Sequence, residues 1–420
     1  MNIKCLTLAA SALAAFACTA VAQELVGITK MTPTVVVQQF SGNCAHKRCV
    51  PASFERQVVT HAGGSAYDSR IQGTWITNGL LLANVDPWGG NCQYICKPVK
   101  IPLPPVSGTK MFATGLAFCD SGALNSTGAI GPGYLFVSYN NGYIARMDVS
   151  RCTVKPKFCK VTVPTGYTIA GLATDDVNRR LFIGMTSVVG GNLIFVSDLD
   201  KNWCQPLCKA QPTACSSTQS LGPLTGLAFD PCRQALYVTD GVFTTRYAVA
   251  SKPSCQLKAA GCCKRTGDPF TGLCLLPRRD IHNVGKSCTI PKCEACPTMR
   301  AELAGDPVLG NPYFGLALRN APNKTTTAIL AAGIGACNPI GVGLGFCETI
   351  KIALPPITIF YAVAPITTAG CNRNITLPWQ VPINQGLCGL KVSFQWLVVC
   401  QGNPTGHGVT NCIDFTFSGS

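Results

Sequence analysis

Charged side chains are scarce in this chain: Asp, Glu, Lys and Arg make up 13% of its 420 residues, and aromatic residues make up 8%. No stretch after the N-terminus offers the roughly 20 uninterrupted apolar residues of a membrane-spanning helix, so no membrane span is expected. Acids are rarer than bases, and the formal net charge is +15. Such a balance favours attraction to polyanions.

Motifs for catalysis are also lacking. No Gly-x-Ser-x-Gly sequence occurs, which removes the usual signature of the nucleophile elbow of α/β-hydrolases. The four histidines, which we expect in exposed loops, are His46, His61, His282 and His407. A zinc site is an alternative for His282 with Cys288, Cys293 and Cys296, because Cys293 and Cys296 have ligand spacing. If the protein is exported to an oxidising compartment, its cysteines form disulfides and are not available as thiolate ligands of zinc. Because catalytic motifs are lacking, we expect a non-enzymatic protein without a cofactor.

Cysteine, glycine and proline are abundant, with 26, 42 and 29 copies. Residues 1–22 have the positive start, apolar stretch and small-x-small end of a secretory signal peptide. Cleavage after Ala22 would remove Cys5 and Cys18 and leave 24 cysteines, an even number. This predicts a secreted, disulfide-rich protein of the extracellular space or cell surface, with the periplasm as an alternative. The Gly and Pro content favours short strands joined by turns.

A short apolar sequence motif centred on glycine recurs six times, at intervals of 42 to 56 residues. Its central residues are Gly27, Gly73, Gly115, Gly171, Gly226 and Gly272. A second apolar strand follows the first five copies, a third strand is visible in places, and a Cys-flanked segment follows every copy; the sixth copy lacks a clean second strand. Repeats of this length are typical of β-propeller blades. The prediction is an all-β fold with a six-bladed propeller over residues 23–300. Five blades result if the first and sixth units share one blade.

A cysteine pair recurs at the same place in each unit, and we expect each pair to join a local hairpin at the outer edge of a blade. Such short loops contribute about 2 kcal/mol each. The pairs are Cys44/Cys49, Cys92/Cys96, Cys152/Cys159, Cys204/Cys208, Cys255/Cys262 (or Cys263) and Cys288/Cys293.

The fifth unit carries a family resemblance. Gly226-Leu227-Ala228-Phe229-Asp230, followed by Leu236-Tyr237-Val238-Thr239-Asp240, resembles the blade pattern of NHL-type six-bladed propellers. Propellers of this shape include enzymes, receptors and scaffolds, so the likeness does not select a function. The enzymatic alternative is a calcium-dependent hydrolase or lactonase that holds its metal in the central channel. Its candidate ligands are Asp175, Asp230 and Asp240, with Asn84, Asn140 and His282 as further candidates.

The pattern changes near residue 300. Residues 301–312 hold two glycines and two prolines and predict a linker, and residues 313–420 predict a β-sandwich. Large apolar residues alternate along 390–399, which is typical of a strand buried on one face. Sequential pairing is the simplest disulfide arrangement: Cys337–Cys347, Cys371–Cys388 and Cys400–Cys412. Residues 310–318, 321–322 and 387–390, with Gln395, resemble a C-terminal sandwich module of secreted planctomycete-type bacterial proteins. This likeness implies an exported accessory or anchoring module.

Basic residues gather in and beside the Cys-flanked segments. If these segments form the outer edges of blades, the ring has a cationic rim. Its predicted binding residues are Lys47, Arg48, Lys97, Lys100, Lys155, Lys157, Lys160, Lys264 and Arg265, with Lys201, Lys209, Lys252 and Lys258 in the wider set. The expected function is adhesion to an anionic polysaccharide or cell-envelope surface, with self-association left open. The alternative is that lysines only protect strand edges from aggregation. Aromatics are not interleaved with these lysines, so sequence-specific nucleic-acid recognition is not expected.

Overall fold

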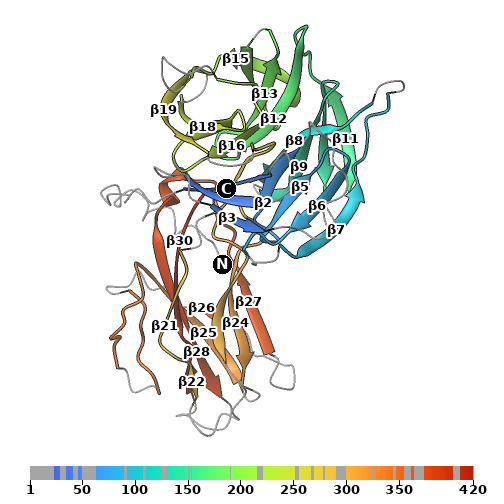
Figure 1. Ribbon diagram of the computed structural model, residues 1–420. Coiled ribbons are helices and arrows are strands. Elements are labelled where there is room, and N and C mark those ends of the chain that lie inside the picture. The colour runs from blue at the N-terminus through green and yellow to red at the C-terminus, as the bar shows by residue number, and fades with distance from the viewer. Residues whose placement is uncertain are drawn as a thin grey trace. The chain divides into compact units, whose positions relative to one another are not determined.

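The computed structural model is all-β, and its strands form several antiparallel sheets (Figure 1). Contacts between Cα atoms divide the chain into two compact units, one over Thr19–Pro277 and one over Arg278–Ser418. The structure describes residues 23–28, 35–40, 46–49, 63–88, 92–106, 110–124, 130–149, 152, 154–189, 191–214, 221–250, 255–265, 269–277, 280–289, 299–322, 325–343, 347–353, 361–363, 373–400 and 407–419. The predicted signal peptide lies outside these ranges. No helix within them is long and apolar enough to cross a membrane.

Five four-stranded antiparallel sheets make up the described part of the N-terminal unit. In four of them the strands follow one another in sequence, as in a meander. The first is β4 (Gly64–Asp68), β5 (Gly73–Thr77), β6 (Leu81–Val85) and β7 (Tyr94–Lys100). The second is β8 (Ala113–Leu124), β9 (Ile130–Tyr139), β10 (Tyr143–Asp148) and β11 (Lys155–Lys160). The third is β12 (Tyr167–Asp175), β13 (Arg180–Ser187), β14 (Gly191–Asp198) and β15 (Asn202–Ala210), and the fourth is β16 (Gly226–Asp230), β17 (Ala235–Thr239), β18 (Phe243–Val249) and β19 (Leu257–Lys264).

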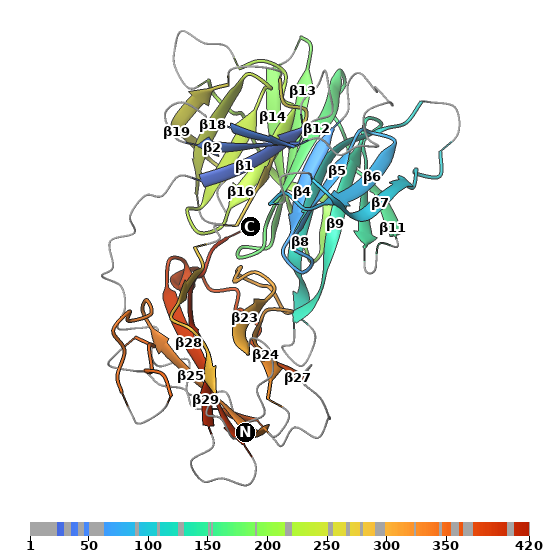
Figure 2. The ribbon, with the colours of Figure 1, turned by 60° about the horizontal axis from the view of Figure 1, so that its bottom comes forward.

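The fifth sheet joins the two ends of the repeat region. Strands β1 (Gln23–Ile28), β2 (Val35–Phe40) and β3 (His46–Cys49) pair in order, and β20 (Cys274–Leu275) completes the sheet beside β1. Val26 faces Cys274 and Leu25 faces Leu275 in this antiparallel pair. The first and sixth copies of the repeat therefore contribute to one sheet, as the sequence alternative states. Figure 2 shows β1 and β2 side by side.

The first strands of successive sheets contact one another in a closed cycle: β4 with β8, β8 with β12, β12 with β16, β16 with β20, and β20 with β4. Glycines permit this approach. A Cβ atom at Gly115 would lie 2.7 Å from Cα of Gly171, and one at Gly272 would lie 2.7 Å from Cα of Gly64. Gly171 meets Gly226 and Gly226 meets Gly272 at similar distances. The recurring glycine is thus needed because backbones of neighbouring strands meet without room for a side chain.

Two of the six predicted central glycines lie elsewhere. Gly27 is on β1 and Gly73 is on β5, each the second strand of its sheet, and Gly64 on β4 occupies the equivalent place in the cycle. Gly73 has a different reason to be glycine, since a Cβ there would meet the side-chain oxygen of the buried Asn84. The recurring sequence motif therefore groups two kinds of glycine: those at contacts between first strands, and those on second strands with different neighbours.

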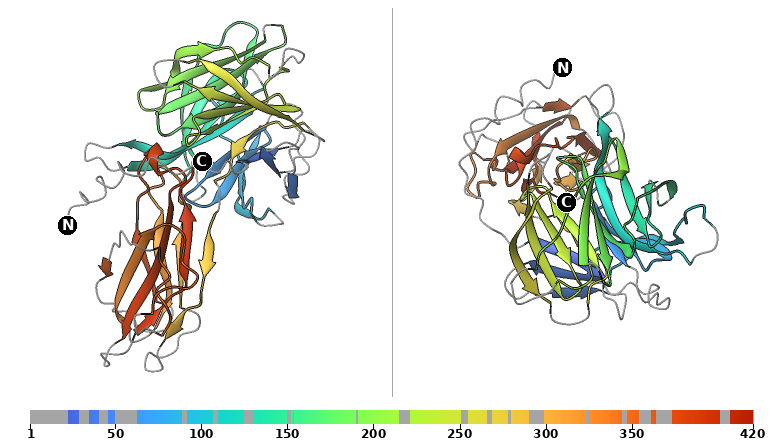
Figure 3. Two further views of the ribbon diagram at one scale, coloured as in Figure 1. Left: turned by 90° about the vertical axis from the view of Figure 1, so that its left-hand side faces the viewer. Right: turned by 90° about the horizontal axis from the view of Figure 1, so that it is seen from above.

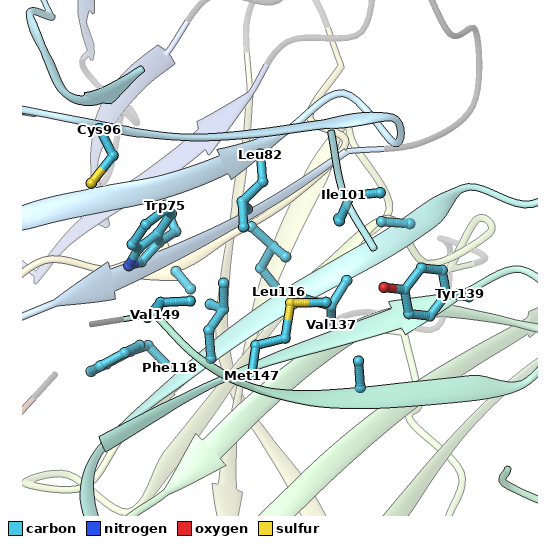
Figure 4. Close-up of a cluster of buried hydrophobic side chains, with 14 residues drawn as sticks. Trp75, Leu82, Cys96, Ile101, Leu116, Phe118, Val137, Tyr139, Met147 and Val149 are labelled. Atoms are coloured by element: carbon cyan, nitrogen blue, oxygen red, sulfur yellow. The ribbon is translucent and has the colours of Figure 1, made fainter. Parts of the chain in front are cut away.

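Apolar side chains fill the space between adjacent sheets. One cluster brings together Trp75 and Leu82 from the first sheet with Leu116, Val137 and Met147 from the second, and all five are buried (Figure 4). The second strands β9, β13 and β17 are apolar along their buried lengths because sheets pack on both of their faces, as the sequence predicts.

The described part of the C-terminal unit forms two sheets, which Figure 3 shows from two further sides. The larger includes β21 (His282–Val284), β30 (Cys412–Thr416), β28 (Lys391–Cys400), β25 (Thr325–Ile334) and β26 (Tyr361–Val363), and β29 (His407–Val409) joins β28 to β22 (Cys288–Thr289). The smaller consists of β23 (Arg300–Ala304), β24 (Gly315–Ala321) and β27 (Arg373–Pro378). Phe314 lies next to β24 and packs 5.3 Å from the Phe415 ring on β30. The two sheets thus share an aromatic core, as in a sandwich.

Two expectations for this region are wrong. The sequence assigned residues 278–300 to the sixth repeat, but β21 pairs with β30 and β22 pairs with β29. The strand over 390–399 was expected to bury one face, yet Ser393 and Gln395 on the other face are also fully buried. The segment around Lys351 and Ala353 lies on that face and covers them. Lys351 N donates to Gln395 Oε1, and Ala353 N donates to Ser393 Oγ.

Three disulfides of the described part of the N-terminal unit join neighbouring sheets rather than local hairpins. Cys96 on β7 bonds to Cys152, which precedes β11; Cys159 on β11 bonds to Cys204 on β15; and Cys208 on β15 bonds to Cys255, which precedes β19. The predicted pairs Cys92/Cys96, Cys152/Cys159 and Cys204/Cys208 are therefore wrong. Cys204 and Cys208 show why: four residues of strand span about 13 Å, beyond the roughly 7 Å limit of a disulfide.

The prediction that Cys262 bonds to Cys255 is also wrong. Cys255 is bonded to Cys208 of the neighbouring sheet, so it is not the partner of Cys262. Cys262 lies on β19, where it is exposed and faces Thr245 of β18, and it is disulfide-bonded elsewhere. The alternative partner Cys263 is wrong for the same reason, and it too is disulfide-bonded. The physical cause is again the extended strand, which carries Cys262 away from the start of β19.

Disulfides in the C-terminal unit also differ from the predicted sequential order. Cys288 bonds to Cys347. Cys337, which follows β25 of the larger sheet, bonds to Cys412 on β30. The predicted pairs Cys288/Cys293, Cys337–Cys347 and Cys400–Cys412 are therefore wrong, although Cys388 and Cys400 are each disulfide-bonded. Cys44, Cys293 and Cys371, and the side chain of Cys49, lie outside the described residues. Several disulfides in one chain are compatible with an oxidising environment.

Candidate binding surface

The outermost strands of the sheets carry the exposed lysines. Strands β7, β11, β15 and β19 are each last in their sheets, and exposed residues alternate along them with partly buried ones. The exposed lysines on these strands are Lys97, Lys100, Lys155, Lys157, Lys160, Lys209, Lys258 and Lys264. None of the four strands contains Asp or Glu. The structure thus gathers predicted residues that are far apart in sequence onto one kind of element.

These lysines have few electrostatic partners. No carboxylate of the described residues forms an ion pair with them, whereas Asp175 and Asp200 of the same unit pair with Arg180 and Arg179. Lys160 Nζ lies 5.7 Å from the centre of the Tyr143 ring and Lys264 Nζ lies 5.8 Å from that of Phe243. Their charge is therefore largely uncompensated and faces solvent.

Three predicted rim residues need separate description. Arg265 is 5% exposed, and its guanidinium carbon lies 3.9 Å from the centre of the Phe270 ring, so its charge is not presented to a partner in solution. The expectation that Arg265 belongs to the exposed rim is wrong, because its side chain is buried and packs on the Phe270 ring. Lys47 and Arg48 lie on β3, the last strand of its sheet, and their side chains are outside the described part of the structure.

The three candidate calcium ligands are engaged in separate turns. Asp175 Oδ2 accepts from Arg180 Nε at 2.8 Å, and Asp175 Oδ1 accepts from Asn178 N at 3.0 Å. Asp230 Oδ1 accepts from Cys232 N at 2.9 Å. Burial raises the pKa of Asp230, while Arg233 and the backbone donors at Arg233 and Cys232 oppose the shift. These contacts are those of turn-capping carboxylates.

Asp240 is at the opposite end of its sheet from Asp230. Asp230 closes β16 and faces Ala235, whereas Asp240 follows Thr239, which faces Gly226 at the start of β16. Asp240 Oδ1 accepts from Val242 N at 2.9 Å and Phe243 N at 2.7 Å. The third further candidate, His282, is on β21 in the other unit, where its Nδ1 lies 2.8 Å from Asp414 Oδ1. The structure does not bring the three carboxylates together around one ion.

The space enclosed by the first strands of the five sheets is small. The cavity lined by the first strands has a volume of about 30 Å³, room for one or two water molecules. Its polar side chains are already satisfied, since Ser65 Oγ donates to Val26 O and Thr174 Oγ1 donates to Phe118 O. Cys274 also lines it, and burial raises the pKa of this thiol to about 12. A thiol with that pKa stays neutral and is a poor nucleophile.

Comparison with known proteins adds little. No family model matches the chain, and no curated protein matches it. Among solved structures, Raptor from Chaetomium thermophilum matches with 11% identity and a TM-score of 0.30, over 62% of this chain and 22% of that one. A structure of BBS1N in complex with ARL6DN matches with 11% identity and a TM-score of 0.31, over 93% of this chain and 94% of that one. A protein of unknown function from Desulfotomaculum acetoxidans matches with 13% identity and a TM-score of 0.31, over 71% of this chain and 79% of that one. The chain therefore spans about a fifth of the Raptor chain, and these weak likenesses identify no family.

Proposed function

We propose that the five N-terminal sheets are the blades of a closed five-bladed propeller, in a protein exported to an oxidising compartment. The closed cycle of strand contacts and the glycine at each contact support this reading. The five-bladed form was the sequence alternative to six blades. Disulfides between neighbouring blades support export, because thiols of this number are kept reduced inside most cells.

The proposed function is non-enzymatic binding of an anionic polysaccharide on a cell envelope or in an extracellular matrix. The observation that carries it is the set of exposed lysines on β7, β11, β15 and β19, which form no ion pair with any described carboxylate. Protection of strand edges explains why lysines occur there, but it does not require all acids to be missing from the same strands. Uncompensated charge on a rigid support attracts polyanions and is screened by salt.

Retention on immobilised alginate, a polyuronate, tests the proposal. We expect the chain to bind at low salt and elute as salt rises. Replacing Lys97, Lys157 and Lys264 with Gln should weaken binding about tenfold, because each lost lysine removes a counterion-releasing contact. The matched control replaces Lys110, Lys286 and Arg300, which are exposed cations outside the outermost strands.

Both variants lose three positive charges, so a difference between them measures the effect of charge position on the outermost strands and not the effect of net charge. Equal weakening by both would show that the overall positive charge alone is responsible, and the proposal of a binding rim would fail. Near-ultraviolet circular dichroism checks that each variant keeps its folded core. Unmodified dextran, which is neutral, should retain neither variant nor the original chain.

A further inference from the structure

A surface groove lies at the seam between two neighbouring sheets of the N-terminal unit. Its volume is about 620 Å³, and it is lined by Cys208, Lys209, Ala210, Gln211, Cys255, Gln256, Leu257 and Lys258. This volume is within the range of about 300–1,000 Å³ that is usual for ligand pockets. The groove is therefore a far larger space than the cavity on the axis of the sheet cycle.

Two outermost strands and one disulfide build the groove. One side comes from the end of β15 and the residue after it, and the other comes from the start of β19 and the two residues before it. These strands belong to different sheets, and their adjoining ends are joined by the disulfide between Cys208 and Cys255, whose Cα atoms are 6.2 Å apart. Because a covalent bond spans the seam, the spacing of the two walls is fixed before any ligand binds.

The side chains at the groove have a definite chemistry. Lys209 on β15 and Lys258 on β19 both line the groove, one from each strand, and both are exposed. Gln211 and Gln256 are also exposed and bring one carboxamide from each wall. Among the residues that the structure describes, the lining holds no acid and no aromatic residue. Ammonium groups bind carboxylates, and carboxamides donate to and accept from hydroxyl groups.

We infer that this groove binds a uronate-bearing segment of an acidic polysaccharide, with Lys209 and Lys258 on its carboxylates and Gln211 and Gln256 on its hydroxyls. The inference rests on the proposed function and gives it a location and a ligand class. A chain of sugar acids supplies carboxylates and hydroxyls together, which is the combination that the lining can bind. Single-stranded nucleic acid fits less well, because its bases need aromatic platforms for stacking.

The test uses the full chain with its disulfides intact and a short oligogalacturonide, titrated by calorimetry at low salt. Replacing Lys209 and Lys258 with Gln removes both carboxylate partners. The matched control replaces Lys155 and Lys157 with Gln, which are exposed on β11 and do not line the groove. We expect the groove variant to lose at least about tenfold in affinity and the control to lose about twofold, because hydrogen bonds to charged groups are the stronger contacts.

Equal weakening by the two variants would overturn the groove as a site and leave the proposed rim intact. No binding by the unaltered chain to either the oligogalacturonide or alginate would overturn both. A sulfated dextran oligosaccharide of the same length separates the sources of negative charge: binding as tight as that of the uronate would overturn the carboxylate assignment. Gln211→Ala should weaken the uronate several-fold, and an unchanged affinity would remove the hydroxyl contact from the inference.

Discussion

At the scale of single residues, the recurring glycines have a steric explanation. Gly115 and Gly171 lie on neighbouring first strands, and a Cβ at Gly115 would be 2.7 Å from Cα of Gly171, closer than real Cβ contacts allow. The obstacle is backbone rather than a movable side chain. A methyl group would therefore separate two strands whose other contacts are already packed.

Gly115→Ala should destabilise the N-terminal unit by about 1–3 kcal/mol, the usual range for overpacking in a core. Urea unfolding followed by tryptophan fluorescence, to which the buried Trp75 of this unit contributes, measures the change. Gly343→Ala is the control, since a Cβ there meets nothing within 4 Å. Unchanged stability of the Gly115 variant would contradict the close approach of the first strands.

At the scale of strands and sheets, the sequence predicted more of the fold than of the covalent connections. The apolar runs in β9, β13 and β17 correctly indicated buried strands, and the Cys-flanked segments are the outermost strands of their sheets. The pairing of cysteines could not be read from spacing. Cys152 and Cys159 are close in sequence, but they bond to opposite neighbours because strand geometry separates them. Cys255 and Cys262 were mispaired for the same reason, since Cys255 bonds across the seam to Cys208.

The same reasoning explains what was missed at the candidate site. The basic segments were recognised, but the groove between β15 and β19 needs two segments whose contact depends on the Cys208–Cys255 bond. Arg265 was grouped with the rim because of its neighbours in sequence, and only its contact with the Phe270 ring shows that it is buried. The local sequence pattern indicates which segments form strands, whereas the packing between strands of different sheets determines which side chains lie together at a site.

Joining different sheets gives these disulfides a larger expected effect than local bridges would have. Cys159 and Cys204 are 45 residues apart in sequence. A closed loop of that length stabilises by about 4 kcal/mol in the chain-entropy treatment, against about 2 kcal/mol for a loop of a few residues. Replacing both cysteines with Ser should lower the free energy of unfolding by roughly the larger amount, measured by urea denaturation.

Peptide mapping under non-reducing conditions provides the direct check. A protease digest should yield a fragment in which Cys159 is linked to Cys204, and reduction should separate the two peptides. Recovery of Cys152 linked to Cys159 would instead support a local bridge and contradict the connection between sheets. Keeping the digest acidic prevents thiol exchange, because the attacking thiolate is then nearly absent.

At the scale of the whole molecule, each of the two units has a buried core and disulfides of its own. The aromatic residues Phe314, Phe415 and Phe417 pack with Trp379 in the C-terminal unit. Its bonds Cys288–Cys347 and Cys337–Cys412 both close within residues 278–418. A unit with its own core and its own cross-links has what an independently folding domain needs.

A pair of fragments tests where this unit begins. Residues 278–418 include β21 and β22. Residues 301–418, which begin at the linker predicted from composition, lack both strands and leave Cys347 without Cys288. Loss of a native disulfide from a small secreted domain typically costs about 2–5 kcal/mol and often prevents folding. After secretion into an oxidising compartment, the longer fragment should unfold cooperatively with a near-ultraviolet signal from Trp379 and Trp396, and the shorter one should not. If both fragments melted at the same temperature with the same signal, β21 and β22 would be dispensable additions, and the unit would begin at the glycine- and proline-containing segment after all.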